Sequence, residues 1–230
     1  MNWMDRIALF EPLDFAAVAI TFLLWAVIGW LVEHSGARRP STALLMAQYR
    51  REWMQQMITR EPRVFDAQTL NTLRQGTAFF ASTSVIAIGG ALALIGNAER
   101  VGGVAEDLTQ TNAPAIVWEI KLLILLIFLT NAFLKFVWAN RLFGYCSVLM
   151  GAVPNDQTDP RAPKIAHKAG EINVTAARSF NRGLRAIYFA LASVAFLAGP
   201  VPLIAAAVLT TIVIWRREFA SHSRRILLAD

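Results

Sequence analysis

The chain has 230 residues, of which 56% are hydrophobic and 17% are charged, and its formal net charge is +6. Soluble globular domains average roughly 45–50% apolar and about 25% charged residues. Here the apolar residues fall in long blocks with almost no charge, which excludes an ordinary soluble domain. We expect an all-α fold, a polytopic membrane helical bundle. The single cysteine, Cys146, excludes an intramolecular disulfide framework.

Four apolar segments are candidates for membrane-embedded helices. A helix of about 20 apolar residues crosses the hydrocarbon core of a bilayer, and the segments are residues 13–32, 77–96, 122–138 and 186–215. The loops 33–76 and 139–185 are too long to be simple connections, so we expect them to contain cytoplasmic helical extensions. The whole chain, residues 1–230, is expected to form a single integral membrane domain.

The second apolar segment contains small residues at helical spacings of three, four or seven. Such a stripe lets a neighbouring helix approach closely, and it usually serves helix packing rather than lining a pore. The predicted helix-packing residues are Ala78, Ser82, Gly89, Ala93 and Gly96.

The third apolar segment contains a polar face. Asn131, Lys135 and Trp138 lie at i, i+4 and i+7, and Arg141 follows Trp138 by three residues, which allows a cation–π contact. An ionisable residue inside a membrane is a functional candidate, but a lysine near the end of a span can also snorkel to the surface. The sequence leaves three roles open for Lys135: it lines an ion path, it forms a buried pair with another residue, or it snorkels to the membrane surface.

The fourth apolar segment is too long for one straight span. Its 30 residues would reach about 45 Å as a helix, against a hydrocarbon core of ~30 Å. Gly199, Pro200 and Pro202 interrupt it, and we predict a hinge there. The segment is therefore either a helical hairpin or a single kinked span.

The distribution of basic residues indicates an orientation. The loops 33–76 and 139–185 each contain seven bases, against four and three acids, whereas residues 97–115 contain one base and three acids. The positive-inside rule places the N-terminus outside and both long loops in the cytoplasm. Four more arginines follow the last segment, and a hairpin would bring them to the cytoplasm as well. These are Arg216, Arg217, Arg224 and Arg225.

The two long loops contain basic helical patterns. A helix is expected from Pro40-Ser41-Thr42 to Ile58, lying either on the inner leaflet or packed under the bundle with its arginines in water. In the second loop Arg178, Arg182 and Arg185 are spaced for one helix face. They could bind lipid headgroups, an anionic ligand or carboxylates of a partner, or form a solvated rim.

Signatures of catalysis and cofactor binding are absent from the sequence. It contains no nucleophile elbow, metalloprotease helix, phosphate-binding loop or dinucleotide fingerprint. His34, His167 and His222 are far apart, so we expect no metal, no cofactor and no enzyme activity. The basic charge fits loops that face anionic lipid, and we expect no nucleic-acid partner.

Several segments resemble a family of bacterial membrane proteins known as domain of unknown function 599. They are FLKFVWANRLFGYCSVLMGAVP (133–154), AARSFNRGLRAIYFA (176–190), WRREFASHSRR (215–225) and QGTAFFASTSVIAIGGALALIG (75–96). The resemblance covers essentially the whole chain. It implies an integral inner-membrane protein of unassigned activity, and it transfers no catalytic residue.

Two functions are compatible with these observations. The first is an accessory or scaffold membrane protein that binds another membrane protein through the small-residue face of the second segment. The alternative is a homo-oligomeric channel or carrier, in which Lys135 and the nearby arginines form a positively charged cytoplasmic mouth. The expected partners are the bilayer, including its anionic lipids, and either further copies of the chain or another membrane protein.

Overall fold

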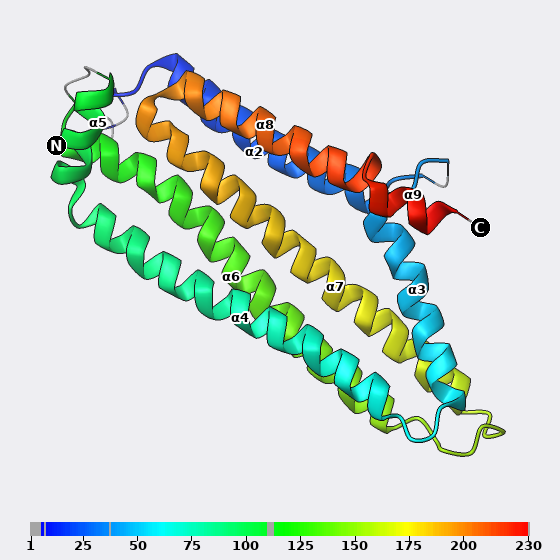
Figure 1. The fold of residues 1–230 in the computed structure, drawn as a ribbon. Helices are drawn as coiled ribbons and strands as arrows, with labels where there is room; N and C mark the ends of the chain where they lie inside the picture. Colours follow the sequence, from blue (N-terminus) through cyan, green and yellow to red (C-terminus); the bar gives the residue numbers. More distant parts are fainter. Residues whose placement is uncertain (1–5, 7, 37, 110–112, 230) are drawn as a thin grey trace. The chain divides into compact units, whose positions relative to one another are not determined.

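The structure is a computed structural model that describes residues 6, 8–36, 38–109 and 113–229. Within these ranges the regular elements are all helices, so the expected all-α fold is confirmed. Figure 1 shows their order along the chain. The helices are α2 (Pro12–Glu33), α3 (Thr42–Gln56), the 3-10 turn η1 (Met57–Thr59), α4 (Val64–Ile95), α5 (Ala98–Thr109), α6 (Ala115–Gly151), α7 (Ala162–Ser193), the 3-10 turn η2 (Val194–Ala198), α8 (Pro200–Phe219) and α9 (His222–Leu228).

Three of these helices, α2, α4 and α6, are long and apolar enough to cross a membrane. They cover the first three predicted segments, except that α4 ends at Ile95, one residue before the predicted end of the second segment. Their most apolar windows have mean hydropathies of 2.4, 2.0 and 2.2. α4 and α6 run beyond those segments, to 32 and 37 residues. The extensions are the helical parts expected in the two long loops. By length and composition the chain therefore fits a membrane protein.

The chain divides into two compact units, and several helices pass from one to the other. The first unit contains residues 1–31, 84–132 and 184–217. The second contains residues 32–83, 133–183 and 218–230. The expectation of a single domain over residues 1–230 stays a prediction.

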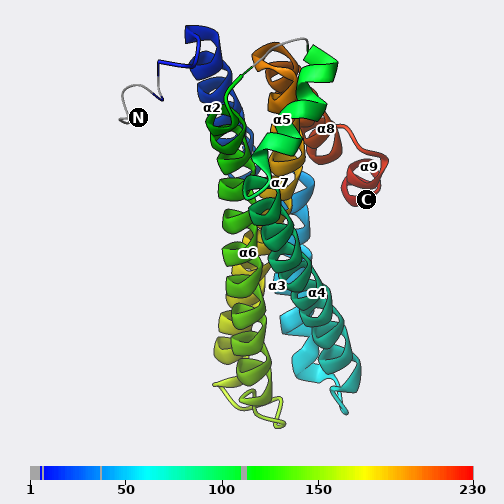
Figure 2. The same ribbon diagram turned by 90° about the vertical axis from the view of Figure 1, so that its left-hand side faces the viewer.

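The fourth apolar segment is interrupted at the predicted hinge. α7 ends at Ser193, η2 follows, and Gly199 has a φ of +113°, which favours glycine because it has no Cβ. Pro200 then begins α8, a position where its missing N–H costs no hydrogen bond. Figures 1 and 2 show that the chain reverses its direction at this break. The Arg217 guanidinium also donates to the Tyr188 hydroxyl, which joins the two arms.

Small side chains form a continuous seam along α7. They recur with the three- and four-residue spacing of a packing face, and all of them are buried. In the second unit position 183 requires glycine, because an added Cβ would lie 2.6 Å from Cε1 of Phe136 in α6. We call these residues the α7 seam: Ala162, Ala166, Ala169, Asn173, Ala176, Ser179, Gly183, Ala186, Ala190 and Ser193.

The C-terminal segment contacts the residues that follow α2, within the second unit. Thr42 donates its hydroxyl to the Glu218 carbonyl at 3.1 Å, and the Ala43 N–H donates to the Glu218 carboxylate at 3.0 Å. Arg224 Nε donates to the Pro40 carbonyl at 2.8 Å. These contacts bring the end of the chain to the end of α2. They support the hairpin, which stays a prediction.

The hairpin predicts that residues near Gly36 and His222 lie on the same side of the membrane. We expect Gly36→Cys and His222→Cys, each made with Cys146→Ser, to react from one side with a membrane-impermeant maleimide, since both positions are exposed. Asn97→Cys, after α4, should react from the other side. Labelling of positions 36 and 222 from opposite sides would contradict the hairpin.

Candidate functional site

The residues of the predicted polar face of α6 lie in different environments. In the first unit the Asn131 side-chain oxygen is buried, and among the described residues it has no hydrogen-bond partner. In the second unit Lys135 is partly buried, and its carbonyl accepts the Ser179 hydroxyl at 2.9 Å. Trp138 is 49% exposed. These three residues therefore do not form one continuous polar surface.

Arg141 does not pair with Trp138 as the sequence suggested. Its guanidinium carbon lies 5.7 Å from the centre of the Tyr145 ring, and its Nε donates to the Tyr145 hydroxyl at 2.5 Å. The tyrosine oxygen can accept a hydrogen bond from a guanidinium, whereas the indole of tryptophan offers only a donor. The exposed aromatic partner of Arg141 is thus one turn further along α6.

The three arginines predicted on one face of α7 have three different environments. Arg178 is exposed, and Arg182 forms an ion pair with Glu33, its Nε lying 2.9 Å from Oε1. Arg185 is 6% exposed in the first unit, where a Cβ added to Gly29 would lie 3.7 Å from its Nε. The three arginines therefore do not share one environment. The roles proposed for these arginines stay predictions.

The predicted small-residue stripe is not covered by the residues that the structure describes. Four of its members, Ala78, Ser82, Gly89 and Ala93, lie on α4, Gly96 directly follows this helix, and all five are exposed. Packing within the chain uses another side of this helix, where buried residues recur every seven positions: Leu70, Thr77, Ser84 and Ala91. A Cβ added at Gly89 would meet nothing within 4 Å. A packing role for the stripe therefore requires another molecule.

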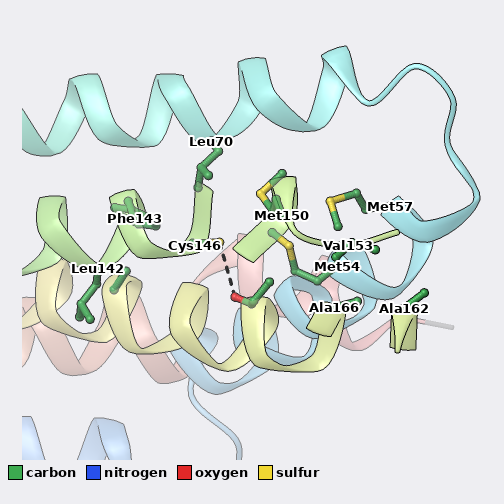
Figure 3. Close-up of a cluster of buried hydrophobic side chains, with 12 residues drawn as sticks. Met54, Met57, Leu70, Leu142, Phe143, Cys146, Met150, Val153, Ala162 and Ala166 are labelled. Atoms are coloured by element: carbon green, nitrogen blue, oxygen red, sulfur yellow. Dashed lines mark hydrogen bonds between the residues drawn. The ribbon is translucent and has the colours of Figure 1, made fainter. Parts of the chain in front are cut away.

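A buried polar cluster joins α3 to α6 and α7 in the second unit. Arg50 donates to the side-chain oxygen of Asn173 at 2.6 Å, and the Asn173 amide lies 3.6 Å from the Cys146 sulfur. Cys146 in turn lies 3.5 Å from the Ala169 carbonyl, the dashed line in Figure 3. In the part of the chain that the structure describes, no carboxylate pairs with Arg50. Burial lowers the pKa of Arg50 below its ordinary value.

Apolar side chains surround this polar cluster. Figure 3 shows Met54 and Met57 near Met150 and Val153, at the end of the bundle formed by α3, α6 and α7. Met54 and Met57 are fully buried. The helix expected over residues 40–58 is therefore packed into the second unit, with Ser41 as its N-cap, and Arg50 is only partly exposed.

Arg51, next to Arg50, makes an ion pair on the outside of this contact. Its guanidinium nitrogens lie 2.5 and 3.2 Å from the two carboxylate oxygens of Glu171. The hydrogen bond from Arg51 lowers the pKa of Glu171. Both side chains are about two-fifths exposed, 42% and 43%, so the pair is worth at most about 1 kcal/mol.

Asn173 and its partners were missed as interacting residues by sequence reasoning. The available signal was an amide within a run of small residues on one face of a helix, a position where a polar side chain is buried and needs a partner. The arrangement fixes α3 to α6 and α7, and it contains no acid–base pair. Among the described residues no group of three His, Cys, Asp or Glu side chains could hold a metal ion.

Removal of the Asn173 amide should destabilise the protein. Asn173→Leu leaves the buried Arg50 guanidinium without its acceptor, which costs about 1–3 kcal/mol, and we expect a lower unfolding temperature in detergent. Arg50→Met combined with Asn173→Leu should recover part of the loss. Thr175→Leu, at an exposed position of α7, is the control. Equal stability of Asn173→Leu and the parent would contradict the prediction.

The Arg51–Glu171 pair should contribute stability that depends on pH. Because the pKa of folded Glu171 lies below its ordinary value of 4.5, the contribution is present above pH 4.5 and is lost as the pH falls through the folded pKa. Glu171→Gln should therefore lower the unfolding temperature at pH 7 and have a smaller effect at pH 3. Glu52→Gln, at an exposed position of α3, should show no such pH dependence. An effect of Glu171→Gln that grows in acid would be the contrary result.

Comparison with known proteins gives one match that covers most of the chain. No curated protein and no solved structure matches it. The match is to the family described as protein of unknown function, DUF599, and it extends over residues 16–223. It includes α3, α4, α6, α7 and α8, and thus both the α7 seam and the exposed stripe of α4. The chain belongs to the DUF599 family.

Proposed function

We propose that this protein is a multi-pass accessory or scaffold protein of the bacterial inner membrane, without a catalytic site of its own. It associates with another membrane protein through the small-residue stripe of α4. The observation that supports this most directly is the exposure of all five stripe residues, four of them on a helix that is apolar enough to span the bilayer and Gly96 directly after it.

The two small-residue faces of the chain differ in what covers them. The α7 seam is buried throughout, so its small side chains allow close packing against other helices of the same chain. Only 11% of the apolar window of α4 is buried, compared with 39% for α6. Small residues on a membrane helix permit close backbone approach, which is the main source of helix association in lipid. The α4 stripe has this property and is left open for a partner.

The alternative, a homo-oligomeric channel or carrier, has less support. Its predicted cationic mouth needs Lys135, Arg141 and the arginines of α7 to act together. Arg141 instead contacts Tyr145, Arg182 pairs with Glu33, and Arg185 is buried near Gly29. Arginines that already contact the protein in separate places contribute less to a shared anion path.

The proposed topology has the N-terminus outside and both long loops in the cytoplasm. The excess of bases in those loops supports it. The contacts of Glu218 and Arg224 with residues 40–43 support a C-terminus on the same side as the first long loop. The arginines of the loops and tail would then face the anionic lipids of the inner leaflet.

The test compares two glycine substitutions on the same helix. Gly89→Leu places a large side chain on the stripe, whereas Gly90→Leu places it about 100° around the helix. Neither position has a neighbour within 4 Å of an added Cβ, so both variants should fold. Native mass spectrometry of the protein, extracted gently from its own membrane, measures what remains bound.

We expect a stoichiometric complex with a different membrane protein, lost on Gly89→Leu and kept on Gly90→Leu. A discrete homo-oligomer would overturn the proposal in favour of the channel, for which Lys135→Met should then abolish flux. A complex that is equally stable in both glycine variants would show that the stripe is not the contact surface.

A further inference from the structure

The end of the chain, residues 218–229, contacts the beginning of α3 and the connection before it, within the second unit. This segment consists of the last two residues of α8, a short link and α9, and α9 lies beside α3 (Figure 1). We call it the C-terminal strap. Its hydrogen bonds join positions 175 to 184 residues apart, so they depend on tertiary packing.

Glu218 of the strap caps the first turn of α3. Its carboxylate accepts the Ala43 N–H at 3.0 Å, and its carbonyl accepts the Thr42 hydroxyl at 3.1 Å. The first N–H groups of a helix have no partner within the helix, and the helix dipole favours a carboxylate at this end. The N-cap Ser41 accepts the Leu44 N–H in the same turn. Glu218 therefore supplies a second cap from the other end of the chain.

Arg224 of the strap contacts the connection that leads into α3. Its Nε donates to the Pro40 carbonyl at 2.8 Å, and its backbone N–H donates to the hydroxyl of Ser221, the N-cap of α9. The neighbouring Arg225 is exposed, and its guanidinium lies 3.5 Å from the His222 ring. Arg224 thus links α9 to a distant part of the chain, whereas this contact of Arg225 stays within α9.

The strap is held less firmly than the helix that it contacts. Phe219 is 8% exposed, but no residue within α9 is buried. Beyond its first turn α3 is anchored by buried side chains, namely Leu45, Ala47 and Met54. Segments with few buried apolar contacts and with accessible hydrogen bonds open at a lower free-energy cost than a packed core. The strap can therefore be released while the buried part of α3 stays in place.

We propose that the C-terminal strap is a conformational device that opens and closes over the beginning of α3. In the closed state Glu218 and Arg224 hold residues 40–44. In the open state α9 moves away, the Ala43 N–H and the Pro40 carbonyl become accessible to water, and the first turn of α3 frays. The strap contains no residue of the α4 stripe, so the device goes beyond the proposed scaffold function and does not depend on it.

The test is amide hydrogen–deuterium exchange of the full-length protein in nanodiscs, measured by mass spectrometry. Arg224→Ala removes the hydrogen bond to Pro40, whereas Arg225→Ala removes the same charge from the next position of α9. We expect exchange of residues 40–46 to rise at least about fivefold with Arg224→Ala and to stay within about twofold of the parent with Arg225→Ala. Unchanged exchange of residues 40–46 in Arg224→Ala would overturn the proposal.

The same measurement shows whether the two ends of α3 behave differently. Peptides from residues 50–58, at the buried end, should exchange within about twofold of the parent rate in Arg224→Ala, because their contacts do not involve the strap. Faster exchange confined to residues 40–46 is the expected result. An equal rise in both segments would show that α3 loosens as one body, which would contradict a strap that acts on its beginning alone.

A second pair of variants tests the contact of Glu218. Glu218→Ala removes the acceptor of the Ala43 N–H, whereas Glu52→Ala removes a carboxylate from an exposed position of α3. We expect exchange of residues 40–46 to rise at least about threefold with Glu218→Ala, as for the loss of a helix cap, and to stay within about twofold with Glu52→Ala. The closed state as proposed would be wrong if Glu218→Ala exchanged at the parent rate.

Discussion

Close approach of neighbouring helices to α7 is the constraint on which the packing of both units depends. Nine of the ten residues of the α7 seam are Ala, Ser or Gly, and all ten are buried. In the second unit this allows the Ser179 hydroxyl to reach the Lys135 carbonyl and lets Phe136 lie against Gly183. In the first unit Phe189, beside the seam residue Ala190, packs on Phe128 with ring centres 6.0 Å apart. Larger side chains on the seam would separate these helices.

The polar interactions of the second unit follow from that packing. Asn173 is the one amide of the α7 seam, and it supplies the acceptor for Arg50 and a contact with Cys146. Arg50 is partly buried and its acceptor is a neutral amide, so the loss of this hydrogen bond would leave the guanidinium poorly compensated. Where the helices meet water, ordinary ion pairs such as Arg51–Glu171 take over. The second unit is thus joined by apolar, polar and ionic contacts at successive depths.

The α4 stripe shows that a pattern of small residues like that of the α7 seam can be exposed rather than buried within the chain. Its spacing resembles that of a packing face, yet the residues buried within the chain, Leu70, Thr77, Ser84 and Ala91, lie on another side of the helix. Periodicity reports which residues share a face, but not whether the partner of that face belongs to the same chain.

The sequence by itself determined the all-α class, the three long apolar helices, the start of α3 at Ser41 and the break at Gly199-Pro200. These features depend on local chemistry: hydrocarbon run length, capping groups and backbone restriction act over a few residues. Only the tertiary structure decided that Arg182 pairs with Glu33, that Arg50 binds Asn173, and that the α4 stripe is exposed. The two pairs join positions 149 and 123 residues apart. Such contacts are set by how the helices pack, and no local rule of spacing or charge specifies which distant residue a side chain meets.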